Sequence, residues 1–368
     1  MREGEQQAAG VAAGKAEGPD KRTLAERFIA AFRLPYALGC VLIGFGLFGL
    51  FDTALTHLAD SADLPVAIQL TLTGQNLAQS ALIAYAFYAP RYMRRKLAET
   101  TSSLPSLMGD ESRGFRNPFA GISSVRPQVI AWIAFLAALL FAVNVAAFVG
   151  GSAETSVSIG GAFSPLGFFA SLFDVVSLAA ATLALSSVVW TYYTITMGIH
   201  RFSQAPLELR PYYEDPFLGL KPIGSLALTL ASVYFGFIAL LLLSVLISPK
   251  TPQLGDILAV GGFLLGLIAF GVYLFFLPLT RLHRRMVAEK GKARRALLPQ
   301  LQAVFEGASN PGSGDDLGRA FRVDMLDRKV ANMAVWPYDI GILGRLSVIA
   351  ASVTAILISR IVALVFHI

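Results

Sequence analysis

A chain of 368 residues is long enough for two or three soluble domains, but its composition argues against a soluble protein. Hydrophobic residues make up 55% of the chain, charged residues only 15%, and the mean hydropathy is +0.61, whereas soluble domains carry roughly 25% charged residues. The abundant aromatic and aliphatic residues exclude an intrinsically disordered chain. The one cysteine, Cys40, excludes an internal disulfide and a thiolate metal cluster.

Residues 1–27 are expected to form a disordered cytoplasmic tail, because Ala, Gly, Gln and Glu dominate its first part. Beyond it lie seven apolar stretches of about 20 residues or more, the length that crosses a bilayer. A backbone in lipid has no water to bond, so such stretches must be helices. The sequence therefore predicts an all-α, polytopic membrane protein with seven transmembrane helices. The expected spans are Leu34–Leu55, Val66–Tyr88, Val129–Val149, Pro165 to about His200, Ile223–Ile247, Ile257–Leu277 and Ile340–Phe366.

The positions of lysine and arginine predict the orientation of the chain, because cytoplasmic loops are enriched in both. Of the 30 basic residues, 27 lie on one side of the expected bundle, only Lys250 lies on the other, and Arg345 and Arg360 fall in the last span. We therefore expect a cytoplasmic N-terminus and an external C-terminus in the plasma or inner membrane. The same basic residues favour contact with anionic headgroups of the cytoplasmic leaflet. They follow the span ends, which does not indicate a nucleic-acid partner.

Two segments are expected on the cytoplasmic side, a loop at 89–128 and a helical hairpin at 279–339. Apolar residues recur at helical spacing after the sixth span, which predicts an amphipathic helix kinked near Pro278 and Pro299. A second helix is expected from about Leu317 to Met333, with Leu317, Phe321 and Met325 or Leu326 on one face. The hairpin is interpreted either as a packed cap on the fourth helix or as a partner-docking module. Amphipathic helices usually serve packing, which favours the cap.

Polar residues inside two expected spans are candidates for a transport pathway. Gln69, Thr73, Asn76 and Ser80 share one helical face of the second span, and Ser352 and Ser359 are seven residues apart in the last. Polar groups in lipid must face the bundle interior or a wet cavity. The stripe therefore indicates either a pathway lining or a buried network of interhelical hydrogen bonds.

Opposite charges in two other expected spans are candidates for an ion pair. Asp174 and Arg360 both fall in the outer half of their spans, where each would be costly alone, so we expect them to pair. The predicted ion pair implies that the fourth and seventh spans are neighbours.

Several glycine and proline motifs are expected to be structural. The GxGxxG match at Gly44–Gly49 lies in a membrane helix without a preceding strand, so it predicts close helix packing rather than dinucleotide binding. Gly262 and Gly266 predict a second helix contact. Asp215, before Pro216, is expected to cap the start of a helix. We find no catalytic constellation, and no enzymatic activity, cofactor or metal is expected.

Two features resemble known families. The stretch Pro278-Leu279…His283…Met286…Glu289-Lys290, together with Trp336-Pro337-Tyr338-Asp339, resembles an uncharacterised family of prokaryotic multi-pass membrane proteins. That resemblance covers about the last quarter of the chain and implies no known activity. The layout of the spans is similar, in topology only, to the seven-helix ion channels that include insect gustatory and odorant receptors.

The leading functional hypothesis is a homo-oligomeric channel or small-solute carrier with a pathway between the second and seventh spans. The alternative is a membrane-embedded sensor or assembly subunit whose cytoplasmic hairpin docks a partner. A membrane enzyme ranks third. The polar stripe favours the first hypothesis and the hairpin favours the second.

Overall fold

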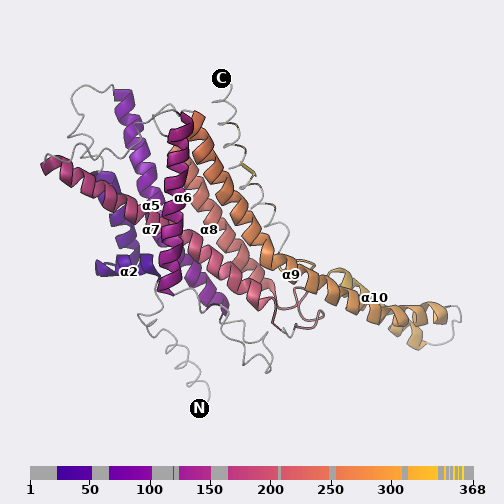
Figure 1. Cartoon of the computed structure of the whole chain (residues 1–368). Helices are drawn as coiled ribbons and strands as arrows, with labels where there is room; N and C mark the ends of the chain where they lie inside the picture. The colour runs from indigo at the N-terminus through magenta and orange to yellow at the C-terminus, as the bar shows by residue number, and fades with distance from the viewer. Residues whose placement is uncertain are drawn as a thin grey trace, which may run out of the picture.

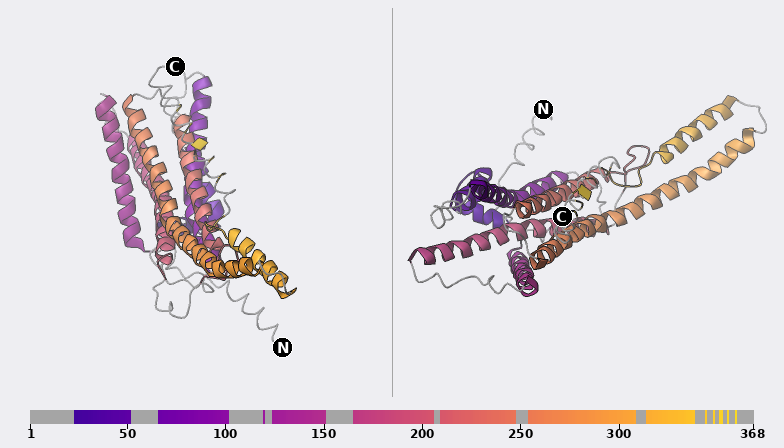
Figure 2. Two further views of the ribbon diagram at one scale, coloured as in Figure 1. Left: turned by 90° about the vertical axis from the view of Figure 1, so that its right-hand side faces the viewer. Right: turned by 90° about the horizontal axis from the view of Figure 1, so that it is seen from above.

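The structure is a computed structural model that describes residues 23–51, 66–101, 119, 124–150, 165–205, 209–247, 254–308 and 314–338, with a few single positions between 344 and 359. These ranges are mostly helical, with turns and irregular segments such as 209–220, and they contain no strand, as the sequence predicts. Long helices lie side by side in a bundle, and a helical hairpin projects beyond its foot (Figures 1 and 2). The foot is the end where α5 and α7 finish and α8 begins. The elements are α2 (Leu24–Ala31), α3 (Tyr36–Val41), η2 (Leu42–Phe51), α5 (Val66–Thr101), α6 (Val125–Gly150), α7 (Pro165–Phe202), α8 (Lys221–Leu246), α9 (Leu254–Ala308) and α10 (Gly314–Ala331).

Three helical segments among the described residues are long and apolar enough to cross a membrane: Val175–Phe202, Lys221–Leu246 and Val260–Val304. The bent pair of α2 and α3 adds a fourth if it forms one span. Several long apolar helices of this kind are consistent with an integral membrane protein. The seven spans and their orientation stay predictions, since several expected spans lie partly outside the described residues.

The N-terminal region departs from the expectation of a disordered tail as far as residue 27. Helix α2 begins at Leu24, where the Thr23 hydroxyl accepts a hydrogen bond from the Glu26 amide and the Glu26 carboxylate accepts one from the Thr23 amide. This reciprocal cap satisfies amides that a helix start leaves free. The chain then turns by 94° into α3. Arg33 takes a left-handed φ of 55°, and Pro35 offers no amide to continue the helix.

The second expected span extends further than predicted. Helix α5 continues through Pro90 to Thr101, thirteen residues beyond Tyr88, and so occupies the beginning of the segment expected as a loop at 89–128. The residues after Pro90 are mostly Arg, Met, Lys, Leu, Ala and Glu, which are strong helix formers. The basic residues of this segment therefore lie on a helix instead of in a loop.

Helices α7 and α8 agree with the ranges predicted for the fourth and fifth spans. Helix α7 runs for 38 residues and crosses the bundle obliquely (Figure 1). Helix α8 starts with Lys221 and Pro222, and Pro is well placed in a first turn because its missing amide would be unbonded there. Helix α5 packs against α7, α8 and η2.

The expected sixth span and the amphipathic segment after it form one helix, α9, of 55 residues. Pro278 and Pro299 lie inside it, and the helix changes direction part-way along its length (Figures 1 and 2). Its second half leaves the foot of the bundle and pairs with α10 as the predicted hairpin. The boundaries of α10 lie within three residues of the predicted ones.

Two stacked tyrosines join three helices in the core. The rings of Tyr192 on α7 and Tyr234 on α8 stack with centroids 4.5 Å apart, and both side chains are fully buried. The Tyr192 hydroxyl donates to the Gly271 carbonyl and the Tyr234 hydroxyl to the Leu267 carbonyl, each at 3.0 Å, on α9. A Cβ atom at Gly271 would lie 2.3 Å from the Tyr234 ring, so only glycine admits this approach.

Candidate functional site

The polar residues predicted to share one face of α5 have different surroundings in the structure: Ser80 packs against a neighbouring helix, whereas Asn76 is half-buried. Ser80 is fully buried, and its hydroxyl donates to the Asn76 carbonyl at 2.6 Å. A Cβ atom at Gly44 would lie 2.7 Å from the Ser80 carbonyl oxygen and from the Ala84 Cβ. Ser80 therefore lies at a close contact between α5 and η2. The predicted packing role of the glycine motif is confirmed at Gly44, while Gly46 has nothing within 4 Å among the described residues. The second predicted contact is wrong among these residues, because a Cβ atom at Gly262 or Gly266 would also meet nothing within 4 Å.

The other predicted site residues are brought together only in part. The Asn76 side chain is half-buried, and those of Gln69 and Thr73 lie outside the described side chains. Ser352 and Ser359 are exposed, and the Ser352 hydroxyl donates to the Val348 carbonyl at 2.7 Å. The predicted ion pair of Asp174 and Arg360 lies outside the described side chains. The shared pathway of two spans and this ion pair both stay predictions.

A small polar cavity, which sequence reasoning missed, lies between the start of α2 and the middle of α7. It has room for about one water molecule. The buried Thr191 hydroxyl and Trp190 Nε1 border this cavity, and neither has a hydrogen-bond partner among the described residues. Gln128 on α6 also lines the cavity, and its Oε1 accepts a hydrogen bond from the Leu24 amide at 2.9 Å. These groups match one bridging water between the N-terminal helix and the bundle.

Helix α2 is also held by a buried ion pair to α5. The Glu26 carboxylate bonds the Arg94 guanidinium, and both side chains are nearly buried. Gly39 on α3 completes the contact, because a Cβ atom there would lie 2.7 Å from the Ile29 side chain. The N-terminal helix is thus fixed across the foot of the bundle (Figure 1).

The residues that carry the family resemblance meet at the foot of the bundle. The His283 ring on α9 stacks on the Trp336 ring with centroids 4.1 Å apart, and its Nδ1 lies 2.8 Å from the Val335 carbonyl. Trp336 in turn contacts Tyr338, whose ring also packs near Phe275. We call His283, Trp336, Pro337 and Tyr338 the junction cluster. It connects the hairpin to the bundle.

Backbone contacts make the junction cluster tight. A Cβ atom at Gly224, in the first turn of α8, would lie only 1.9 Å from the Pro337 carbonyl oxygen, so the two backbones touch. The Tyr338 hydroxyl is buried without a partner among the described residues, and burial raises the pKa of this phenol to about 12. Burial therefore disfavours the phenolate form of Tyr338 further.

Basic side chains of α9 cap the ends of two other helices. The Lys290 ammonium donates to the carbonyls of Ala331, the last residue of α10, and of Met333, each at 2.9 Å. The Arg285 guanidinium donates to the Ala205 carbonyl at 2.8 Å, just after α7. Carbonyls at a helix C-terminus lack intrahelical donors and attract cations. Both residues fix α9 to its neighbours.

Asp215 caps a turn instead of the predicted helix. Its carboxylate accepts hydrogen bonds from the Phe217 and Gly219 amides at 2.9 Å. Leu218 and Gly219 have positive φ values of 56° and 82°, which end any helix before α8 starts at Lys221. The motif is therefore a compact turn that leads into α8.

The face of α10 that carries Phe321 and Met325 is exposed. These two residues, which the sequence places on one helical face, are 63% and 48% exposed, whereas Val323 and Val330 are buried on the side that faces α9. One turn apart, Phe321 and Met325 form an apolar patch that we call the α10 patch. Large apolar side chains exposed together mark interaction sites.

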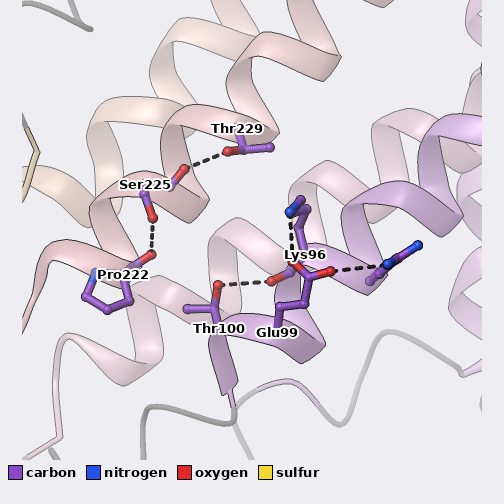
Figure 3. A network of polar contacts seen from close by, with 7 residues as sticks. Lys96, Glu99, Thr100, Pro222, Ser225 and Thr229 are labelled. Carbon is purple, nitrogen blue, oxygen red and sulfur yellow. Dashed lines mark hydrogen bonds and ion pairs between the residues drawn. The ribbon is translucent and has the colours of Figure 1, made fainter. Parts of the chain in front are cut away.

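A surface network lies where α5 ends beside α8 (Figure 3). The Glu99 carboxylate bonds the Lys96 ammonium at 2.7 Å and the Arg95 guanidinium at 3.1 Å, and the Thr100 hydroxyl bonds the Lys96 carbonyl. On α8, the Ser225 hydroxyl bonds the Pro222 carbonyl and the Thr229 hydroxyl bonds the Ser225 carbonyl. Each of these three hydroxyls donates to a carbonyl of its own helix.

Metal chemistry has no donor set in the described ranges, where no group of three or more His, Cys, Asp or Glu side chains gathers. Comparison of the chain with protein-family models, curated proteins and solved structures finds no match.

Proposed function

We propose that this chain is a multi-pass protein of the plasma or inner membrane that serves as an assembly subunit, and that its hairpin docks a cytoplasmic protein. The α10 patch carries this proposal, because Phe321 and Met325 point away from the hairpin interior. The exposed Arg322 and Lys329 lie beside the patch. A partner surface with an apolar centre and acidic rim complements it.

The junction cluster supports the same role. It anchors the hairpin to α8 and α9 through stacked rings and touching backbones. A docked partner would then be held at a fixed position relative to the membrane spans. A rigid support of this kind reduces the ordering cost of binding.

Site-specific photo-crosslinking in cells tests the docking proposal. A crosslinking amino acid at position 321 or 325 is expected to give one adduct of defined mass, while the exposed position Gln302 on α9 serves as the matched control. The variant F321S/M325S is expected to insert and accumulate normally, because both side chains are exposed. When the crosslinking amino acid is placed at position 318 instead, the adduct is expected with the native patch and is expected to be lost in this variant. Absence of an adduct, or the same adduct from position 302, would contradict docking.

The proposed topology places the N-terminus and the hairpin in the cytoplasm, with seven spans. The native Cys40 is buried, so it gives little background in cysteine labelling. Cysteines introduced at Asp63, Glu154 and Ile368 are expected to react with an external, membrane-impermeant reagent, whereas those at Arg113 and Gly312 are not. External labelling at position 312 would overturn the orientation.

A homo-oligomeric channel or carrier is the second proposal, supported by the half-buried Asn76 on the polar stripe. Asn76→Leu is expected to change solute flux in reconstituted vesicles if the stripe lines a pathway. Gln79→Leu is the matched control, because Gln79 is exposed on the same helix. Equal flux in the wild-type protein and the Asn76→Leu variant would contradict the pathway and indicate a packing role for Asn76. The substitution should then lower the free energy of unfolding by about 1 kcal/mol or less.

A further inference from the structure

The second half of α9 exposes basic side chains on the face opposite its packed side. Between Leu279 and Ala308 the sequence has seven lysines and arginines but only two acidic residues. Leu282, Met286 and Leu297 are buried on the packed side. Some of the basic residues on this segment bond to other groups of the protein, and others are exposed without such a partner among the described residues. The exposed ones indicate what this face binds.

Three basic side chains of this segment are already engaged. Arg285 and Lys290 cap helix ends, and the Lys292 ammonium bonds the Glu289 carboxylate at 2.6 Å. By contrast, Arg284, Arg294 and Arg295 are exposed and pair with no carboxylate in the described ranges. Structural roles within the described protein therefore do not account for these three arginines.

Exposed apolar side chains lie among the arginines. Val287 is 43% and Leu298 is 48% exposed. At 100° per residue, these two residues and the three arginines fall within a sector of about 100°. We call Arg284, Val287, Arg294, Arg295 and Leu298 the arginine face. Apolar residues flanked by arginine are typical of helices that lie at a membrane surface.

The position of the arginine face fits the same surface. It lies on the helix that continues directly from the apolar segment of α9, with the first arginine of the face only six residues beyond Pro278. The figures show this part of α9 leaving the bundle at its foot instead of continuing along the bundle axis (Figures 1 and 2). Anionic headgroups attract basic residues within about a Debye length of the surface.

We infer that the arginine face binds anionic phospholipid headgroups of the adjacent leaflet, with Val287 and Leu298 inserted at the headgroup boundary. Guanidinium groups bond phosphate oxygens through paired donors. Binding on this face leaves the α10 patch free for a protein, so the inference stands independently of the docking proposal. The two proposals also involve different side chains and can fail separately.

Spin-label accessibility of the full-length protein in lipid nanodiscs tests the inference. A label at position 298, placed through Leu298→Cys in a Cys40→Ser background, reports contact with acyl chains through oxygen and with water through a nickel chelate. In phosphatidylcholine with 30% phosphatidylglycerol we expect lipid-like accessibility at position 298. In pure phosphatidylcholine, or in high salt, we expect water-like accessibility. A label at Gln300, on another face of the helix, should stay water-like throughout.

Charge variants supply the second arm. The triple variant R284Q/R294Q/R295Q is expected to abolish the phosphatidylglycerol-dependent change at position 298, since each lost charge weakens the contact about five-fold. The matched control R319Q/R322Q/K329Q removes the same charge from α10 and should leave the change intact. Water-like accessibility of position 298 in anionic nanodiscs would overturn the inference, as would equal protection in neutral ones. An equal loss in both triple variants would also overturn it, because it would show a non-specific charge effect. Protection that appears only when an acidic protein is added would assign the face to a protein.

Discussion

The imidazole of His283 stacks on the indole of Trp336, with a centroid separation of 4.1 Å and an angle of 19° between the ring planes. These residues are 53 positions apart, and the whole of α10 lies between them. The stacked pair therefore closes the loop that contains the hairpin. Together with the Lys290 bonds to the end of α10 and the buried Val323 and Val330, this contact at the hairpin's base holds α10 beside α9.

Removal of the stacked pair should loosen the hairpin. Trp336→Ala is expected to lower stability by about 2 kcal/mol, because a half-buried ring and its stacking contact are lost. His283→Ala should cost about 1 kcal/mol, and the double variant should cost less than the sum. Thermal unfolding in detergent measures all three variants. Tyr273→Ala, which truncates a largely exposed ring on α9, is the control, and strictly additive losses would contradict the coupling.

The glycine motif of the first expected span offers a matched pair of substitutions. Gly44→Ala is expected to destabilise the fold by about 1 to 3 kcal/mol, since its Cβ atom would overlap the Ser80 carbonyl oxygen and Ala84. Gly46→Ala meets open space and should be neutral or slightly stabilising, because Ala favours helices. Melting temperatures compare the two variants. An equal effect of both substitutions on the melting temperature would contradict the close contact between η2 and α5.

The ion pair of Glu26 and Arg94 should be costly to break on one side only. Glu26→Gln or Arg94→Gln leaves the other group nearly buried without its charge partner, and each is expected to cost about 3 kcal/mol. The double variant Glu26→Gln/Arg94→Gln should recover part of that loss. Proteolysis near α2, followed with melting temperature, checks the effect. The exposed pair of Arg328 and Asp324 is the control, for which single changes should cost under 1 kcal/mol.

A pH titration isolates the surface network of α5. The Lys96 ammonium and the Arg95 guanidinium beside Glu99 hold the pKa of that carboxyl below its usual value of 4.5. A lowered pKa in the folded state means that Glu99 stabilises the fold above pH 4.5 and that this contribution fades as the pH falls through the folded pKa. Glu99→Gln should therefore melt slightly below the wild-type protein at pH 7. The difference should vanish in acid, and a difference that grows on acidification would reverse the assignment.

The ion pair of Asp174 and Arg360 remains a sequence-based prediction with a mutational test. Asp174→Asn alone and Arg360→Gln alone should each lower the melting temperature, because each leaves a charge in hydrocarbon without its partner. The double variant should recover much of the loss. Double-mutant analysis of yield and melting temperature measures this coupling, and strictly additive losses would separate the two residues.

Hydrophobic periodicity predicts the helices well because it depends on neighbouring residues alone. The ranges of α7, α8 and α10 follow from runs of apolar residues and their ends. The boundary at Tyr88 was wrong for α5, because basic residues that leave a membrane continue a helix as readily as they form a loop. The turn at Asp215 was misread as a helix cap for a similar reason, since Asp before Pro suits both structures.

The contacts of the site depend on residues far apart in the sequence, and local patterns do not specify them. Periodicity placed Phe321 and Met325 on one face of a helix, but the direction of that face was set by the burial of Val323 and Val330. The contact between Gly224 and Pro337 joins positions more than 100 residues apart. Of the site, only the packing role of Gly44 and the existence of the hairpin followed from sequence alone.

The continuity of α9 has a mechanical consequence. A helix rises 1.5 Å per residue, so the 30 residues from Leu279 to Ala308 extend about 45 Å from the apolar segment. If the helix moves as one body, a tilt of about 5° in the apolar segment displaces the hairpin tip by about 4 Å. Such a displacement equals the width of a side chain, enough to separate a protein surface from the α10 patch. A small tilt of the apolar segment is thus expected to move the far end of the hairpin by several ångströms, with the junction cluster as the point of rotation.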